Sequence, residues 1–331
     1  MMTDRIRVFF TVDTETSMGG AWRNPDYAPL PLDSTIFGKL NSEYYGIPLL
    51  MDILDEHGFR ATFFTEVFCG YNVGFDDVER VFRCINDRGH DAQLHLHPVQ
   101  RFYSDFRRGM PPRERDLMFE LPLDEQRALI AEGVALFRQL CGKSPRAYRA
   151  GCYGASEATL TALRENGIQI DSSYNLASLD ASCGFTERPL NAPLVINGVY
   201  EFPLTVFRVP GVAGYKPMEV SAVAAGEMIG TIRSLKQAGC RDAVLSLHSF
   251  SLMKNLGLRH ENTRPDRIVI QRLRNLCAAL SEARDEIEVG VMGELDLSSV
   301  VLPQPQTVPS VGWLKPAARK LTQAANRLPW L

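Results

Sequence analysis

Carboxylates follow the first apolar stretch of this sequence at a spacing that suits shared chemistry. Residues 6–12 form an apolar, β-branched run that is typical of a buried strand, and Asp13 and Glu15 come directly after it. Side chains two residues apart on an extended chain lie on the same face, so both carboxylates enter one site.

Histidines follow a later apolar run in the same way. His95 and His97 close the run at 92–97, and their spacing places both imidazoles on one face, as one metal ion requires. The chain has only six histidines, and a third of this kind, His248, ends the run at 243–248. A histidine pair at this spacing also occurs in purely structural roles, and His248 alone is equally typical of a core histidine.

Two further polar residues end short predicted strands. Arg149 closes the run at 146–149, and Asp171 follows the run at 168–170. Each has a structural alternative, since an arginine forms salt bridges and an aspartate after a strand commonly caps a turn. The shared placement of all these residues after predicted strands favours one common site.

The elements that position these residues alternate between strand and helix, which predicts a parallel sheet. Seven or more strands favour closure, so we expect an α/β fold with a single distorted (β/α) barrel of about seven parallel strands. In such barrels the site lies at the carboxyl ends of the strands. The predicted strands are 6–12, 60–65, 92–97, 146–149, 168–170, 199–207, 243–248 and 287–291, and the predicted helices are 47–57, 76–88, 124–140, 156–166, 220–238 and 265–284.

The composition changes near residue 300, which predicts a catalytic barrel over 1–300 and a separate segment over 301–331. Residues 303–309 read as a stiff proline-rich linker. The stretch 313–331 has four basic residues and no acidic ones, and it predicts a short amphipathic helix. This helix needs a surface on which to fold, either the barrel itself or the inner face of the cytoplasmic membrane.

Net charge and cysteine usage indicate what kind of partner and compartment to expect. Apolar residues make up 45% of the 331 residues, which is typical of a globular protein with a substantial core. The formal net charge is −3, so the chain has no positive electrostatic field that would indicate a nucleic-acid partner. The seven cysteines form no CxxC pair, which fits free thiols in a reducing compartment. We find no apolar run of about 20 residues and no export signal at the start, so we expect a cytoplasmic protein.

The order of six short motifs resembles the polysaccharide deacetylase family, also called the NodB-homology domain or carbohydrate esterase family 4. The resemblance spans roughly residues 6 to 250. The motifs are Phe10-Thr11-Val12-Asp13-Thr14-Glu15, Ala61-Thr62-Phe63-Phe64, Gly89-His90-Asp91-Ala92-Gln93-Leu94-His95-Leu96-His97, Arg149-Ala150-Gly151-Cys152-Tyr153-Gly154, Asp171-Ser172-Ser173 and Leu245-Ser246-Leu247-His248.

This resemblance implies one divalent metal ion, with zinc as the expected ion, and a set of site roles. Two positions depart from the family pattern. Thr14 stands where the family has a second aspartate, and Val99 stands where its second histidine falls, so either Asp13 or Glu15 is the carboxylate ligand. The implied roles are metal ligands Glu15, His95 and His97, general base Asp13, general acid His248, Arg149 to orient Asp13, and Asp171 to orient His248.

The loop between the first strand and the first helix is expected to shape substrate access. Residues 16–46 are rich in glycine, proline and aromatic residues, and Trp22 is a candidate for stacking on a sugar ring or, equally, for anchoring the loop. Tyr153, after the arginine motif, stands where the family donates a backbone N–H to the oxyanion, and a neighbouring N–H is an alternative donor.

Together these features predict a metal-dependent hydrolase that removes an N-acetyl or N-formyl group from an amino sugar in an intracellular surface-polysaccharide precursor. Two alternatives stay open. One is hydrolysis of a non-sugar amide, and the other is a non-catalytic glycan-binding protein on the same fold.

Overall fold

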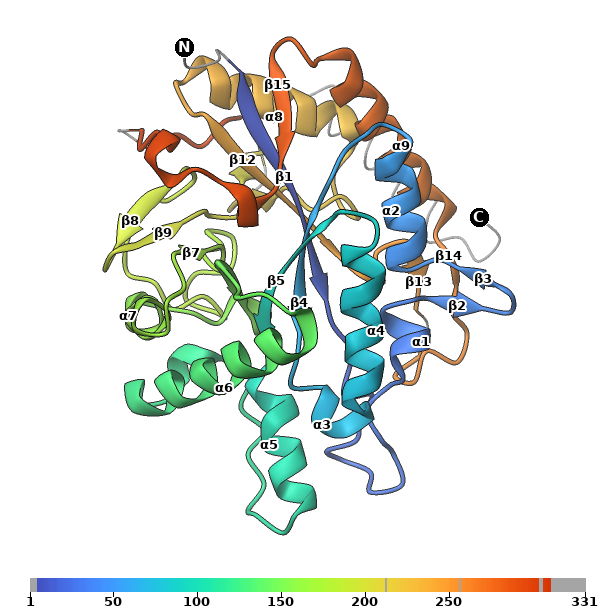
Figure 1. Cartoon of the computed structure of the whole chain (residues 1–331). Coiled ribbons are helices and arrows are strands. Elements are labelled where there is room, and N and C mark those ends of the chain that lie inside the picture. The colour runs from blue at the N-terminus through green and yellow to red at the C-terminus, as the bar shows by residue number, and fades with distance from the viewer. Residues whose placement is uncertain (1–4, 212, 256, 304–305, 311–331) are drawn as a thin grey trace.

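A curved, mostly parallel sheet forms the centre of the computed structural model, which describes residues 5–211, 213–255, 257–303 and 306–310 (Figure 1). The strands follow the order β12-β1-β4-β5-β6-β7-β9-β8, β15 also pairs with β1, and only β8 and β9 are antiparallel. Their bounds are β1 (Ile6–Thr14), β4 (Thr62–Glu66), β5 (Asp91–Leu96), β6 (Ala147–Ala150), β7 (Ile170–Asp171), β8 (Leu194–Ile196), β9 (Val199–Glu201), β12 (Asp242–His248) and β15 (Ile287–Gly290).

The gap between β9 and β12 is bridged by irregular chain rather than by a regular strand. Thr205 donates its backbone N–H to Val244 O (3.2 Å) and accepts from Val244 N–H through its hydroxyl (2.9 Å). Met218 N–H donates to Thr205 O, and Met218 O accepts from Ser246 N–H. The prediction of a distorted α/β barrel is therefore confirmed, with the distortion at this seam.

Six helices match those predicted: α2 (Ile47–Asp55), α4 (Phe75–Asn86), α6 (Leu123–Cys141), α7 (Glu157–Glu165), α8 (Ala225–Gln237) and α9 (Arg267–Glu282). The longest unpredicted helix is α5 (Pro98–Arg107), which starts directly after β5. The remaining elements are α1 (Leu32–Thr35), α3 (Gly70–Val73), the 3₁₀ turns Met118–Glu120, Gly151–Tyr153, Met292–Glu294 and Leu297–Ser299, and the short strands β2 (Lys39–Leu40), β3 (Glu43–Tyr44), β10 (Val206–Phe207), β11 (Lys216–Pro217), β13 (Met253–Lys254) and β14 (Arg264–Pro265).

Helix α4 illustrates how sequence spacing fixes the outer layer. Val78, Val81, Phe82 and Ile85 recur at helical spacing, and each is at most 1% exposed. Phe82 packs edge-on against Phe137 of α6 with ring centroids 5.0 Å apart. Aromatic pairs of this geometry stabilise by about 0.5–1.5 kcal/mol beyond area burial, so the contact ties two neighbouring helices of the outer layer together.

Strand β1 is buried on both faces, which explains its nearly continuous apolar sequence. Val8, Phe10 and Val12 belong to the large core, whereas Phe9 belongs to a small separate cluster with residues of β4, β6, β7 and β12. Because side chains alternate along a strand, Thr11 and Asp13 share the inward face with Phe9. The barrel interior is therefore apolar at the level of Phe9 and polar toward the carboxyl ends of the strands.

The end of the described chain lies against the barrel. Gln306 Oε1 accepts hydrogen bonds from the N–H groups of Asn191 and Ala192, and Arg208 N–H donates to Pro309 O. Part of the predicted linker is thus held by specific contacts. The predicted amphipathic helix falls within 311–331, outside the described residues, so the boundary at residue 300 and the tail stay predictions. In the described part of the chain, no helix is both long enough and apolar enough to cross a membrane.

Candidate active site

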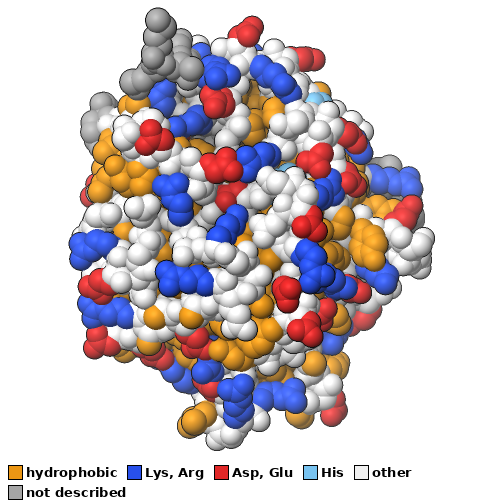
Figure 2. Space-filling view, in the orientation of Figure 1, with side chains coloured by type: hydrophobic (Ala, Val, Ile, Leu, Met, Phe, Trp, Pro, Cys, Tyr) orange, Lys and Arg blue, Asp and Glu red, His pale blue; other side chains and the backbone are white. Residues whose placement is uncertain are grey.

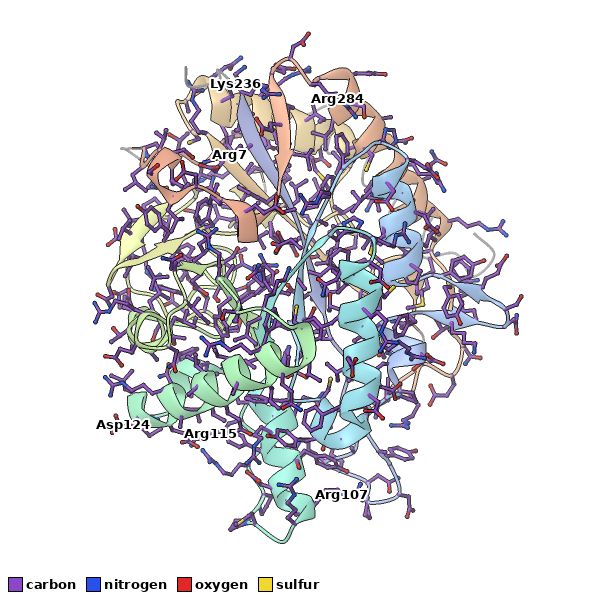
Figure 3. All side chains as sticks on the ribbon, in the orientation of Figure 1. Arg7, Arg107, Arg115, Asp124, Lys236 and Arg284 are labelled. Atoms are coloured by element: carbon purple, nitrogen blue, oxygen red, sulfur yellow. The ribbon has the colours of Figure 1, made fainter. Side chains whose placement is uncertain are left out.

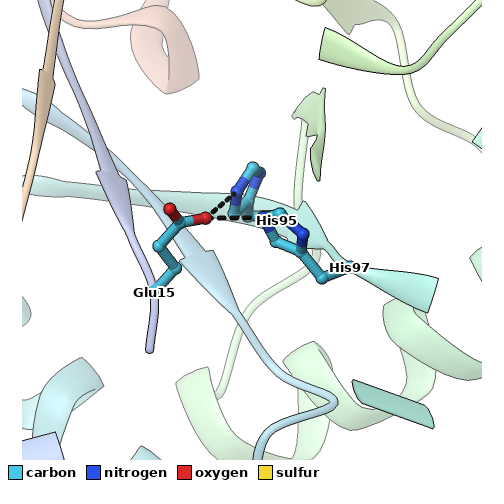
Figure 4. A group of neighbouring side chains, drawn as sticks. All are labelled: Glu15, His95 and His97. Carbon is cyan, nitrogen blue, oxygen red and sulfur yellow. Dashed lines mark hydrogen bonds and ion pairs between the residues drawn. The ribbon is translucent and has the colours of Figure 1, made fainter. Parts of the chain in front are cut away.

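Glu15, His95 and His97 meet at the carboxyl ends of β1 and β5 (Figure 4). Glu15 Oε2 lies 3.1 Å from His95 Nε2 and close to His97 Nε2 at 2.5 Å. The two imidazole rings stand edge to face with centroids 4.9 Å apart. The three residues that the sequence predicts as metal ligands therefore come together, and Glu15 rather than Asp13 is the carboxylate that faces both rings.

The Nδ1 atom of each imidazole has a hydrogen-bond acceptor beside it, and this determines what the Nε2 atom presents to Glu15. His95 Nδ1 lies 2.8 Å from Arg149 O, and His97 Nδ1 lies 2.7 Å from Asp116 Oδ2. Since both partners are acceptors, each Nδ1 carries a proton, and in the neutral rings both Nε2 lone pairs then face the Glu15 carboxylate. Lone pairs and a carboxylate repel unless a cation or a proton lies between them. This donor set fits a divalent ion such as zinc, with positions left for water and substrate.

The carboxylates and His97 in this cluster stabilise each other's charged forms. Burial raises the pKa of Glu15, but attraction to His97 and hydrogen bonds from both imidazoles outweigh it and hold the pKa well below its usual value. Burial lowers the pKa of His97, yet the nearby carboxylates of Asp116 and Glu15 raise it well above the usual value. The site thus favours a positive charge between Glu15 and the rings, which a proton or a metal ion supplies.

Asp13 and Arg149 form a buried ion pair beside this cluster. Arg149 Nη1 donates to Asp13 Oδ1 at 2.7 Å, and the exposed fractions of the two residues are 0% and 4%. The other guanidinium donors bond to Thr11 Oγ1, Ser172 O and Ser172 Oγ, all within 2.9 Å. The guanidinium also lies over the Phe64 ring. Arg149 is therefore held in place by four hydrogen bonds, an arrangement that suits its expected role of orienting Asp13.

His248 approaches the two carboxylates of β1 from the neighbouring strand β12. In the register of the sheet His248 is the partner of Asp13, and its Nε2 lies 4.0 Å from Asp13 Oδ2 and 3.9 Å from Glu15 Oε1. Its side chain is 28% exposed, and the ring stacks on Phe250. A group that adjoins both carboxylates and solvent is placed to exchange a proton with a bound molecule.

Asp171 is not brought to His248, although the sequence suggested that it orients that ring. Asp171 is fully buried, and within the described residues its hydrogen-bond partners do not include His248. Its carboxylate accepts from the hydroxyl (2.7 Å) and N–H of Ser173 and pairs with the carboxyl of Glu201 on β9. Burial and the neighbouring Asp171 raise the pKa of Glu201 well above its usual value, so Glu201 is the protonated member of the pair. The contacts of Asp171 are those of a buried structural pair.

Tyr153 lies beside Arg149, the ion-pair partner of Asp13. Its hydroxyl is 3.1 Å from Ser246 Oγ, and its ring faces the Arg149 guanidinium. Cys152 and Tyr153 both have left-handed backbone angles, with φ of 54° and 59°. Turns of this kind are able to present backbone N–H groups to an anion. The expected oxyanion contact in this turn stays a prediction.

Trp22 packs against helix α5. Its ring contacts those of Tyr103 and Phe106, with centroids 5.1 and 5.4 Å away. Arg259 donates to two backbone oxygens of the same loop and lies over the Tyr27 ring. The observed contacts of Trp22 are therefore those of a loop anchor, and stacking on a sugar stays a prediction.

Two acidic residues of the site were not singled out in the sequence. Asp116, the partner of His97 Nδ1, lies in irregular chain without a local pattern, so only the tertiary fold reveals it. Glu66 ends β4 opposite His95 and accepts hydrogen bonds from the N–H groups of Phe68 and Cys69. The rule that polar residues follow strands would have found Glu66.

Comparison with known proteins identifies the fold. No family model matches the sequence, and no curated protein is similar to it. Among solved structures, a "putative polysaccharide deacetylase" from Mycobacterium smegmatis superposes with a TM-score of 0.55 at 19% identity, covering 91% of this chain and 94% of that one. A 4-alpha-glucanotransferase from Thermococcus litoralis gives a TM-score of 0.50 at 14% identity, covering 88% and 39%. Since these two enzymes carry different chemistry, the likeness shows architecture and leaves the reaction to the site. The chain therefore has the fold of the polysaccharide deacetylases, as the order of its motifs predicted.

Proposed function

We propose that this protein is a metal-dependent hydrolase that removes an N-acyl group, acetyl or formyl, from an amino sugar. The observation that carries the proposal is the grouping of Glu15, His95 and His97 around one point, with Asp13 and His248 beside it. A divalent ion held there would supply Lewis acidity toward the amide carbonyl. The order of the six sequence motifs supports the same reaction class.

The residues around the cluster divide the proton transfers of amide hydrolysis. Asp13 takes a proton from the water that attacks the acyl carbon, and Arg149 holds its carboxylate in position through a hydrogen bond. The carbonyl oxygen gains negative charge, which the N–H of Tyr153 or of a neighbour in the same turn stabilises. His248 donates a proton to the nitrogen as the C–N bond breaks. The products are a free amine and the carboxylic acid.

We propose a surface-polysaccharide precursor as the substrate and the cytoplasm as the compartment. All seven cysteines lie within the described residues and none forms a disulfide, which supports a reducing environment. An intracellular enzyme meets glycans as nucleotide-linked or lipid-linked precursors rather than as finished polymers. The loop at 16–46, which begins directly after Glu15, supplies Trp22 as a candidate sugar contact.

A substrate panel tests this proposal. The zinc-loaded protein is incubated with nucleotide-linked and lipid-linked N-acetyl and N-formyl amino sugars, and release of acetate or formate is followed. We expect release from at least one sugar, lost in Asp13→Asn. Metal binding without release from any sugar, but with hydrolysis of simple cyclic or linear amides, would instead favour the non-sugar reaction. Glycan binding without metal or hydrolysis would favour a binding protein.

A further inference from the structure

The chain leaves the barrel after His97 and returns to it at Asp116, which accepts a hydrogen bond from the same histidine. We call residues 98–116 the α5 arm. Helix α5 forms its first half and projects beyond the other elements at the lower end of the molecule (Figure 1). All residues from 106 to 115 are exposed. A site residue and its partner thus lie at the base of a protruding arm.

The exposed part of the arm combines positive charge with apolar side chains. Residues 106–115 contain four arginines and one glutamate, which gives a net charge of +3. Arg107 and Arg108 form no ion pair with the described residues, and Figure 3 places Arg107 at the outer end of α5. Phe106 and Met110 are 40% and 61% exposed beside them. Blue and orange side chains accordingly lie together at this end of the molecule (Figure 2).

Two other loops bring exposed apolar side chains to the same surface. Tyr27 lies in the loop after β1, and Leu258 lies in the loop after β12, with exposed fractions of 36% and 63%. Tyr103 of the arm donates to Tyr27 O, and Arg259 links the Leu258 loop to Ala28 O. Four of the seven large exposed hydrophobic residues in the described chain thus lie on the α5 arm and the two loops connected to it, a concentration that indicates an interaction surface.

We propose that this rim surface, made of Tyr27, Phe106, Met110 and Leu258 with Arg107 and Arg108, docks on an anionic lipid bilayer. A bilayer interface takes up isolated apolar and aromatic side chains, and anionic lipid attracts unpaired arginines. Charge alone would suit any polyanion, and apolar groups alone would suit a protein groove. The combination on protruding loop tips suits a lipid surface.

The rim surface lies on the same side of the barrel as the candidate active site. Its three loops follow β1, β5 and β12, the strands that carry Glu15, His95 and His248. A bilayer bound at the rim surface therefore faces the carboxyl ends of those strands. Docking itself does not depend on the proposed hydrolysis, so failure of either leaves the other testable.

Sedimentation with lipid vesicles tests the proposal on the full chain. The protein is mixed with phosphatidylcholine vesicles with or without about one third phosphatidylglycerol, and bound and free fractions are measured at low and high salt. We expect binding to anionic vesicles that weakens with salt. Arg107→Gln with Arg108→Gln should weaken it by about 30-fold, since each arginine contributes a factor of about 5. Phe106→Ser with Met110→Ser should weaken it by roughly 10-fold.

A matched control carries the same kinds of change elsewhere. Arg83→Gln on α4 with Val195→Ser on β8 also alters an exposed arginine and an exposed apolar residue, and it should bind as the wild type does. Equal binding to neutral and anionic vesicles would overturn the proposal. So would unchanged binding in both arm variants, including the case in which removal of residues 312–331 abolishes it, because the contact would then belong to the tail. A dimer that the arm substitutions dissociate, without vesicle binding, would assign the surface to a second copy.

Discussion

Arg149 Nη1 lies 2.7 Å from Asp13 Oδ1, in an ion pair that the barrel buries almost completely. The pair joins β6 to β1 across the barrel interior, so one contact serves both the fold and the proposed general base. A buried charge that loses its partner is strongly unfavourable, whereas the intact pair contributes little net stability. Stability and activity should therefore respond differently to changes at its two members.

Arg149→Met should destabilise the protein by about 3–5 kcal/mol, because it leaves the Asp13 carboxylate buried without a partner. The double variant Arg149→Met with Asp13→Asn should recover part of that loss. Urea unfolding followed by circular dichroism measures both. A cost below about 1 kcal/mol for the single variant would show that water solvates the Asp13 carboxylate in the native state.

Metal binding should depend on Glu15 and the two histidines but not on Asp13. We expect one divalent ion per chain in the wild type, loss of that ion in His95→Ala, and retention in Asp13→Asn, because Glu15 and not Asp13 contacts both imidazoles. Elemental analysis of the gently purified variants provides the measurement. Metal lost in Asp13→Asn and kept in Glu15→Gln would reverse the two roles.

Asp116 should act on the metal through His97. Asp116→Asn keeps the shape of the side chain but removes the negative charge beside His97 Nδ1. Loss of a carboxylate partner typically weakens metal affinity by about 10–100-fold, so zinc should still bind but dissociate more readily. Competition with a chromophoric chelator measures the affinity, and Asp124→Asn, an exposed change on α6, is the control. Equal affinities in Asp116→Asn and the control would leave Asp116 no role in positioning His97.

Proton transfer should depend on Asp13 and His248. Once a substrate is identified, Asp13→Asn and His248→Ala should each lower turnover by about 10²-fold or more, because each removes one of the two proton transfers. Both variants should keep the circular dichroism spectrum of the wild type. Near-normal turnover in either variant would remove that residue from the mechanism.

The sequence predicted the barrel and the grouping of Glu15, His95 and His97 because both depend on local pattern. Apolar runs, helical spacing and the residues after each strand are visible in one dimension, and the parallel order of the sheet converts them into one site. The partners of those residues were harder to predict from the sequence. Asp116 reaches His97 from irregular chain. Helix α5 was missed although Val99, Phe102, Tyr103 and Phe106 recur at helical spacing along it. Asp171 was assigned to His248 by motif order, yet its buried partner is Glu201, which only the pairing of β7 with β9 brings close.

The Asp171–Glu201 pair should make stability depend on pH. Glu201 is fully buried and its pKa is raised well above the usual value, so the native state keeps a proton that the unfolded chain releases above about pH 4.3. The stabilising contribution is therefore complete below that pH and falls as the pH rises toward the native pKa, by up to about 1.4 kcal/mol per pH unit. Glu201→Gln retains an acceptor for Tyr174 N–H and a donor for Asp171, but it cannot ionise. The free energy of unfolding of this variant, measured in urea between pH 5 and pH 8, should gain on that of the wild type as the pH rises. A constant difference across that range would mean that Glu201 is already ionised in the native barrel.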